Sequence, residues 1–287
     1  MLFLAVVVAL GPRVPVDTSV EPVEPAADLD LWLAESEAEL GDLVPGAEKT
    51  IVWADAAARA PTPRVVVYIH GFSADRQETA PLADSVAAAL GANLFYTRLT
   101  GHGRSGEEAM AEASVHAWVQ DAEEAMAVAR RLGGRVVLVG ASTGGTLATW
   151  MAAQPRWKSD IEALVLISPN FGPRDGSARI LTWPWGGLVA RLVVGPTRSF
   201  APVNERQAEH WTVEYPTGAL LPMMALVDLA SDVDGRQVSA PVLVVYSPED
   251  RVVDPARTLA RLETLASSRK ELFVVEGSDD PERHVLA

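Results

Sequence analysis

The chain has 287 residues, of which 48% are hydrophobic and 22% charged, so it can bury a full core as one large domain or as a domain with an insertion. Its formal net charge of −14 argues against nucleic acid and anionic membranes as partners, and no basic stripe offsets it. The sequence contains no cysteine, which excludes disulfides, thiolate metal sites and a cysteine nucleophile.

The first ten residues, MLFLAVVVAL, form a continuous apolar run, and a segment rich in proline and acidic residues follows it. The run is too short to span a bilayer as a helix, but it resembles the apolar centre of a signal peptide. We interpret residues 1–27 as part of an export signal or membrane anchor followed by a stiff spacer. The alternative is a disordered or packed N-terminal strand. The protein is therefore predicted to be exported or membrane-anchored, with a cytoplasmic location as the alternative.

From residue 28 onward the sequence alternates between short apolar runs typical of buried strands and segments with helical spacing. The predicted strands lie at residues 48–55, 64–70, 93–99, 135–140, 161–168, 241–250 and 270–277. The predicted helices lie at residues 29–40, 78–92, 114–134, 144–155 and 254–267. This alternation predicts an α/β fold with a mostly parallel sheet and helices on both faces.

The alternation stops at residues 169–240, here called the insertion, which are rich in proline and large apolar side chains. Those side chains are Phe171, Trp183, Trp185, Phe200, Trp211, Met223 and Met224. We predict that the insertion forms a lid over the carboxyl ends of the strands, where open α/β sheets bind ligands. The alternative is that its apolar side chains only build a small satellite core. The predicted organisation is an N-terminal segment at 1–27 and one domain at 28–287 that contains the insertion.

The sequence VVLVGASTGG, residues 136–145, places a single serine between a predicted strand and a predicted helix. Its central part matches the pattern G-x-S-x-G around Ser142, and the flanking strand and helix are the context that this pattern requires. A sharp turn at this point strains the backbone and presents the hydroxyl at a helix N-terminus, where the helix dipole favours negative charge. Ser142 is therefore the candidate nucleophile. A phosphate-binding turn is disfavoured because the P-loop lysine is missing.

A serine hydroxyl needs a base to take its proton and a carboxylate to orient that base. In this type of fold the chain order is serine, acid, histidine, and only His210 and His284 follow Ser142. His284 comes after the last predicted strand, which favours it as the base, whereas His210 lies in the insertion. Asp250, at the carboxyl end of the preceding strand, is the favoured acid. The other acidic residues near these two loops are Glu249, Asp254, Asp279 and Asp280.

The negative oxygen of a tetrahedral intermediate needs hydrogen-bond donors. The backbone N–H of Thr143, directly after the serine, is one predicted donor. The backbone N–H of Phe72, in the loop after the strand at residues 64–70, is the other, and Gly71 permits the turn there. The histidines that precede the serine are predicted to be structural or surface residues: His70, His102 and His116.

Five segments together resemble the α/β-hydrolase superfamily: YIHGFSADRQE, TRLTGHGRSG, VGASTGGTLA, YSPEDRVVDP and GSDDPERH. They are most similar to the serine-hydrolase branch that contains carboxylesterases and monoacylglycerol lipases, over about residues 64–284. The resemblance implies no metal or organic cofactor. It also implies a nucleophile, an acid, a base and two oxyanion donors, at Ser142, Asp250, His284, Phe72 and Thr143.

This sequence departs from the family pattern at two places. The family usually has a further helix after the histidine, whereas this chain ends three residues after His284, which suggests a shortened chain. Related enzymes often carry methionine or another bulky residue at the position of Thr143.

The sequence therefore predicts a serine hydrolase that cleaves carboxylic esters through an acyl-enzyme intermediate. Thioesterase, peptidase and acyltransferase activities use the same machinery and remain alternatives, as does a non-catalytic binding protein on the same fold. The apolar insertion and the negative net charge favour neutral esters with short to medium acyl chains. The predicted partner is a small-molecule ester and not nucleic acid, with possible membrane association through the N-terminal apolar segment. The predicted substrate contacts in the insertion are Trp183, Trp185, Trp211 and Met223.

Overall fold

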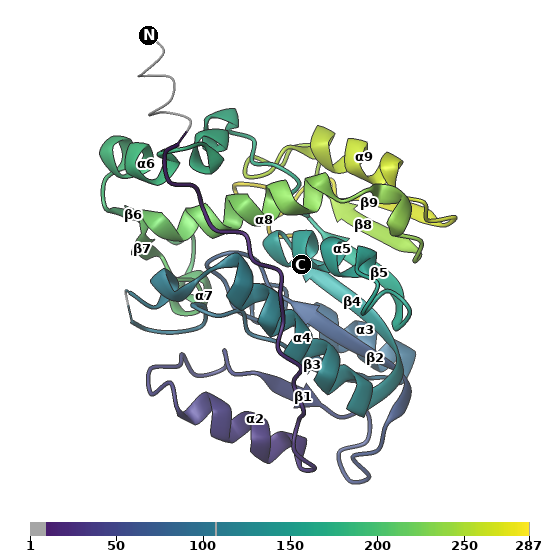
Figure 1. The fold of residues 1–287 in the computed structure, drawn as a ribbon. Helices are drawn as coiled ribbons and strands as arrows, with labels where there is room; N and C mark the ends of the chain where they lie inside the picture. Colours follow the sequence, from purple (N-terminus) through teal and green to yellow (C-terminus); the bar gives the residue numbers. More distant parts are fainter. Residues whose placement is uncertain (1–9, 107, 287) are drawn as a thin grey trace.

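The computed structural model describes residues 10–106 and 108–286 (Figure 1). The apolar run on which the export or anchor prediction rests lies outside these residues, apart from Leu10. Within the described ranges, no helix combines the length and the apolar character needed to cross a membrane.

Seven strands form the central sheet, in the order β1-β3-β2-β4-β5-β8-β9. Their bounds are β1 Thr50–Val52, β2 Thr62–Ile69, β3 Asn93–Tyr96, β4 Gly133–Ala141, β5 Ile161–Ile167, β8 Val242–Tyr246 and β9 Lys270–Val274. Strand β1 runs antiparallel to β3, and all the other neighbours in this sheet are parallel. The predicted α/β fold with a mostly parallel sheet is therefore confirmed.

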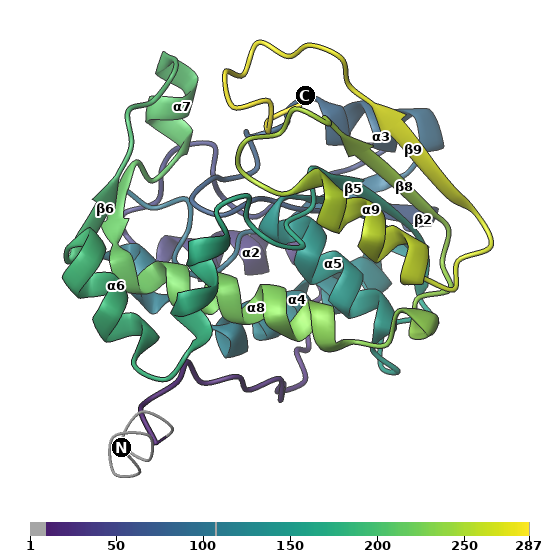
Figure 2. The same ribbon diagram turned by 90° about the horizontal axis from the view of Figure 1, so that it is seen from above.

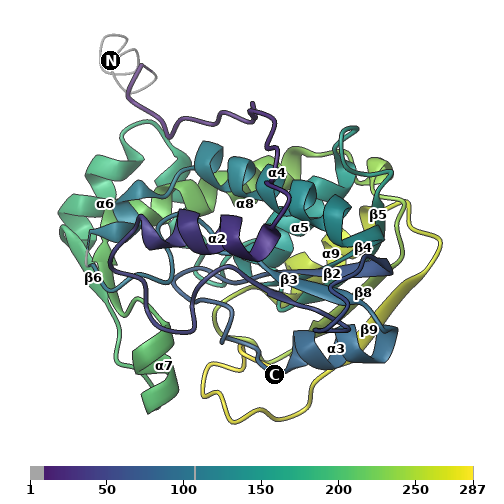
Figure 3. The ribbon, with the colours of Figure 1, turned by 90° about the horizontal axis from the view of Figure 1, so that it is seen from below.

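Helices cover both faces of this sheet, as Figures 2 and 3 show from opposite sides. Their bounds are α2 Leu29–Ala38, α3 Leu82–Leu90, α4 Val115–Leu132, α5 Thr143–Ala153, α8 Leu220–Asp232 and α9 Pro255–Thr264. Alternate residues of β2 point to opposite faces: Val65 and Val67 pack in the core formed with α4, α5 and α8, whereas Val66 packs with α3. Burial of both faces explains why the central strands β2 and β4 carry continuous apolar runs.

Glycines end two of the predicted helices in different ways. Gly91 caps α3 in the left-handed conformation, with φ 57°, and its N–H bonds back to Ala87 and Ala88, as in a typical glycine cap. Gly133 follows α4 with a φ of −171°, which is extended backbone, and it already belongs to β4. The second glycine therefore starts a strand instead of forming a left-handed cap.

The insertion contains short elements before α8. They are the 3₁₀ segments Gly176–Thr182 and Thr217–Ala219, the helices α6 Gly186–Val194 and α7 Glu205–His210, and the two-stranded pair β6 Thr197–Ser199 and β7 Glu214–Pro216. The segment around α7 docks on the loop that leaves the carboxyl end of β2, because Thr212 N–H donates to Ser73 O at 2.7 Å. Arg206 of α7 also donates to Gln77 O at 3.0 Å. The insertion thus reaches the carboxyl ends of the strands, where ligands are expected to bind.

The proline-rich segment before α2 is extended, but it is held against the domain. Gln120 of α4 exchanges two hydrogen bonds of 2.9 Å with the backbone of Glu21. Arg131 of α4 donates to Pro25 O at 3.0 Å. Figure 3 shows this segment running across α4. The part of the predicted spacer that the structure describes therefore lies on the domain surface.

Candidate active site

Ser142 occupies the turn between β4 and α5, and its backbone is strained. Its φ of 47° and ψ of −114° lie in a region that non-glycine residues rarely adopt. Hydrogen bonds on both sides hold this conformation: Ser142 N–H donates to Ile167 O at 2.8 Å, and Ser142 O accepts from Thr146 N–H at 3.1 Å. The side chain therefore stands at the carboxyl end of the central strand and at the N-terminus of a helix.

The glycines around Ser142 are required because backbone segments approach each other closely. A Cβ at Gly144 would overlap the carbonyl oxygen of Ile69 on β2. A Cβ at Gly140 would lie 2.6 Å from Gly144 O, closer than real Cβ contacts. The motif therefore packs α5 directly on the ends of β2 and β4.

Asp250 and His284 come together from two loops that are separate in the sequence. Asp250 follows β8 and is 1% exposed. Its Oδ1 accepts the backbone N–H groups of Val252 and Val253, at 2.8 and 2.9 Å, and its Oδ2 lies 2.8 Å from His284 Nδ1. An ionised carboxylate can only accept, so Nδ1 carries the hydrogen and Nε2 is left as the proton acceptor.

Hydrogen bonds of the backbone at His284 and Val285 hold the loop after β9 in place. His284 N–H donates to Asp280 Oδ2 at 2.8 Å, and Val285 N–H donates to the same oxygen at 2.9 Å. Ser168, directly after β5, donates its hydroxyl to His284 O at 2.7 Å. Because Ser142 N–H bonds to Ile167 O, the residue before Ser168, this contact places His284 beside the Ser142 turn.

The charged and polar groups around His284 stabilise its protonated imidazole more strongly than water does. Burial lowers the pKa of His284, but the hydrogen bond and the charge of Asp250, with smaller contributions from Glu78 and Asp280, outweigh it. The net pKa is raised above 6.5. An imidazole with this environment is suited to accept a proton from a neighbouring hydroxyl.

Ser142 and His284 are neighbours, but they are not hydrogen-bonded in this structure. Within the described ranges, no hydrogen bond joins the Ser142 hydroxyl to another group, and the residue is 8% exposed. Long or open catalytic hydrogen bonds are common in structures without substrate. The arrangement therefore places an oriented imidazole near the turn that carries Ser142.

The two predicted oxyanion donors lie in adjoining segments, because Gly144, next to Thr143, packs against the end of β2 that leads to Phe72. Neither backbone N–H is given a hydrogen bond by the described residues. The loop that carries Phe72 is braced by His70, whose Nδ1 donates to Gly71 O at 2.8 Å and whose Nε2 accepts from Leu99 N–H at 3.0 Å. Burial keeps the pKa of His70 well below 6.5, so it stays neutral in this structural role.

Asn170 and Thr146 support the serine turn, and neither was predicted to do so from the sequence. Asn170 N–H donates to Ser142 O at 3.1 Å, and Thr146 Oγ1 donates to Asn170 O at 2.6 Å. The Asn170 amide also lies 3.3 Å from Met223 Sδ, which brings α8 close to the segment that follows β5. These contacts join positions far apart in the sequence, so spacing alone could not reveal them.

The large apolar residues of the insertion have different surroundings. Met223 lies near the serine turn through Asn170, and Trp211 lines a hollow with Glu78 and the loop after β9. Trp183 is 60% exposed, and Trp185 packs against Gly11 and Pro12 of the N-terminal segment. The remaining three belong to hydrophobic clusters: Phe171 to the main core, Met224 and Phe200 to two small satellite cores. The insertion therefore combines packing with positions near the site.

The remaining histidines have structural or surface surroundings. His102 is buried, and burial lowers its pKa to about 4. His116 is half exposed and faces Asp17 at 3.6 Å. His210 of the insertion lies with its Nδ1 2.9 Å from Asp75 Oδ2, in the loop after β2.

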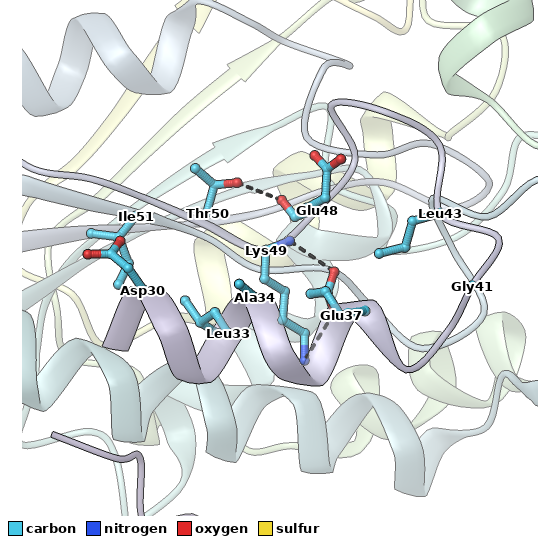
Figure 4. A pocket seen from close by; sticks show the side chains of 11 residues that line it. Asp30, Leu33, Ala34, Glu37, Gly41, Leu43, Glu48, Lys49, Thr50 and Ile51 are labelled. Carbon is cyan, nitrogen blue, oxygen red and sulfur yellow. Dashed lines mark hydrogen bonds and ion pairs between the residues drawn. The ribbon is translucent and has the colours of Figure 1, made fainter. Parts of the chain in front are cut away.

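The hollow shown in Figure 4, of about 480 Å³, lies away from these residues, at the β1 edge of the sheet. It is lined by α2 and the segment around β1, and its polar groups are paired: Lys49 N–H donates to Glu37 Oε2 at 3.1 Å. Glu37 also binds Arg98, at 2.8 and 2.9 Å. These pairs join α2 to the domain, so we assign the hollow no role in chemistry. Within the described ranges, no group of three or more histidine and acidic side chains could hold a metal ion.

Comparison with known proteins identifies related chains. The sequence model of the family Hydrolase_4, described as serine aminopeptidase, S33, matches residues 60–279. A thermostable monoacylglycerol lipase from Bacillus sp. (strain H-257) is 28% identical over 215 residues, which cover 74% of this chain and 81% of that protein.

Solved structures share the fold. A structure from work on LipS and LipT, two metagenome-derived lipolytic enzymes, matches with a TM-score of 0.70 and 23% identity, over 85% of this chain and 91% of that chain. A soluble variant of monoglyceride lipase from Saccharomyces cerevisiae, in complex with a substrate analogue, matches with a TM-score of 0.63 and 15% identity, over 84% and 85% of the two chains.

Proposed function

We propose that this chain, which belongs to the α/β-hydrolase family of the S33 serine aminopeptidases, cleaves carboxylic esters through an acyl-enzyme intermediate. The observation that carries the proposal is the Asp250–His284 contact of 2.8 Å beside the strained Ser142 turn. The lipase name of the Bacillus relative favours an ester over the peptide bond that the family description suggests.

The mechanism follows from the placement of three side chains. Ser142 Oγ attacks the ester carbonyl carbon while His284 Nε2 takes its proton. Asp250 keeps the imidazole in the Nδ1–H form and stabilises the imidazolium that results. The imidazolium then gives the proton to the leaving alcohol, and water repeats the cycle on the acyl-enzyme to release the acid and free Ser142.

The backbone N–H groups of Phe72 and Thr143 are the proposed donors to the tetrahedral oxygen. Both lie at the carboxyl ends of adjacent strands, β2 and β4, and Thr143 is also the first residue of α5. Fixed donors at a helix N-terminus stabilise the negative charge as it develops, with little reorganisation.

A panel of esters with a covalent probe tests this function. A fluorophosphonate should label the protein at one serine, and p-nitrophenyl esters should be turned over. Matched thioester, p-nitroanilide and added-alcohol reactions separate the thioesterase, peptidase and acyltransferase alternatives. The absence of both labelling and ester turnover would contradict the proposal and favour a binding protein on this fold.

The substrate class that we propose is neutral esters with short to medium acyl chains. The insertion supplies apolar side chains near the site, such as Met223 and Trp211, and each buried methylene contributes about 0.8 kcal/mol. The net charge of −14 disfavours anionic esters and helps to expel the carboxylate product.

Replacing Trp211 with alanine is therefore expected to flatten the rise of kcat/KM with acyl chain length while acetate esters are still cleaved. Trp183→Ala is the matched control, because this side chain is 60% exposed and should leave the profile closer to that of the parent. The measurement is kcat/KM across p-nitrophenyl esters of increasing length. If neither tryptophan, nor Trp185 or Met223, changes the profile, the insertion's apolar residues serve packing only.

A further inference from the structure

A buried carboxylate, Glu78, lies between the oxyanion loop and His284 and has no role in the mechanism described above. It belongs to the loop after β2 and is 7% exposed. Its Oε2 accepts the Gly71 N–H at 2.7 Å and lies 3.3 Å from the Tyr68 hydroxyl. Thr79 Oγ1 in turn donates to that hydroxyl at 2.8 Å, so the hydroxyl hydrogen of Tyr68 is directed to Glu78.

These contacts fix the residue immediately before Phe72. Gly71 is held at its N–H by Glu78 and at its carbonyl oxygen by His70 Nδ1. The carboxylate also packs directly on Gly71, since a Cβ there would lie 2.5 Å from Glu78 Oε1. A loop whose amide must be aimed at a transition-state oxygen needs such support, because small displacements of a donor lower the rate.

Glu78 also acts on His284 through its charge. It lines a hollow of about 410 Å³ together with residues of the loop after β9, among them Val285, which directly follows His284. Each group alters the pKa of the other: the charge of Glu78 raises that of His284, and the charge of His284 lowers that of Glu78. Burial nevertheless dominates, and the pKa of Glu78 is raised from 4.5 to about 7. The other charged or titratable groups around the pair are Tyr68, Asp75, Arg206, Asp250, Asp279 and Asp280.

We propose that Glu78 is a positioning residue that holds the Gly71–Phe72 turn and places a second negative charge near the imidazole of His284. This inference concerns the same site as the proposed ester hydrolysis, and its kinetic consequences rest on that proposed function. Glu78 carries this charge above about pH 7, and there it favours the imidazolium that forms when Ser142 loses its proton. It thereby assists Asp250, which makes the direct hydrogen bond.

The substitution Glu78→Gln tests this role, because it removes the charge but keeps an amide oxygen that can accept from Gly71. We expect kcat to fall roughly 10-fold with little change in KM. A neutral amide oxygen accepts the Gly71 N–H more weakly than a carboxylate does, and this loosens the neighbouring Phe72 N–H, the proposed donor in the transition state. Without the Glu78 charge the pKa of His284 falls, because that charge favours the protonated imidazole. His284 must be neutral to act as the base, so the acid limb of the kcat/KM profile should move to lower pH.

Asp279→Asn is the matched control. Its side chain lines the same hollow and is exposed, and no hydrogen bond to it is found among the described residues, so both kcat and the acid limb should stay at the parent values. If Glu78→Gln does not fold, Tyr68→Phe removes only the hydroxyl donor to the carboxylate. The carboxylate is then protonated more readily, and the acid limb should shift in the same direction by a smaller amount.

Nuclear magnetic resonance separates failure of this inference from failure of the proposed function. The pKa of His284, measured from its ring signals among those of five histidines, should fall in Glu78→Gln whether or not the protein cleaves esters. A parent without ester turnover or probe labelling contradicts the proposed function alone. An unchanged His284 pKa in Glu78→Gln, or an unchanged pH profile in an active enzyme, overturns the role assigned to Glu78.

Discussion

Ser142→Ala is expected to lower kcat for ester hydrolysis by about 10⁶ and to abolish labelling by a fluorophosphonate. The reason is that Ser142 is the proposed nucleophile, so the acyl-enzyme cannot form once its hydroxyl is removed. The structural cost should be small, because the hydrogen bonds that hold the turn use the backbone N–H and carbonyl of Ser142 and not its hydroxyl. Turnover of a p-nitrophenyl ester, intact-mass labelling and a thermal melt provide the measurements.

Ser159→Ala is the matched control, because Ser159 is an exposed serine after α5. It should retain both labelling and turnover. Near-parental activity in Ser142→Ala would contradict the nucleophilic mechanism as a whole. Loss of activity together with loss of the folded state would leave Ser142 unassigned, so the melting temperature must match that of the parent before the kinetics are interpreted.

Asp250→Asn is expected to lower kcat by roughly 10⁴. The asparagine oxygen can still accept the Val252 and Val253 N–H groups that Oδ1 accepts now. The amide NH₂ then faces His284 Nδ1, which must become the acceptor, so the ring hydrogen moves to Nε2 and the ring can no longer take the serine proton. The measurement is kcat across pH, because the acid limb should also move to lower pH once the negative charge is lost.

The acidic residues after β9 provide the comparison for Asp250→Asn. Asp279→Asn should have little effect. Asp280→Asn should have an intermediate effect, because Asp280 accepts the backbone N–H of His284 and Val285 and so holds the loop without touching the imidazole. A ranking in which Asp279 or Asp280 is the most sensitive position would transfer the acid role to the terminal loop.

The sequence by itself determined the strands, most helices and the serine turn of this protein. Buried parallel strands need continuous apolar, β-branched residues, and the runs at β2 and β4 meet this need over neighbouring residues. The turn at Ser142 needs glycines at fixed offsets because β2, β4 and α5 approach closely there, and this requirement is visible in a short stretch of sequence. These features could be predicted from the sequence because each depends on residues that are close together in the chain.

Tertiary structure alone decided which carboxylates surround His284 and what the insertion contacts. Asp250 and Asp280 were both plausible partners in the sequence, and only the path of the loop after β9 directs His284 Nδ1 to the former and its backbone N–H to the latter. Glu78 carried no motif, yet folding buries it against Gly71. Such pairings depend on distances between segments far apart in the chain, and hydrophobic periodicity records which face is buried but not which partner it meets.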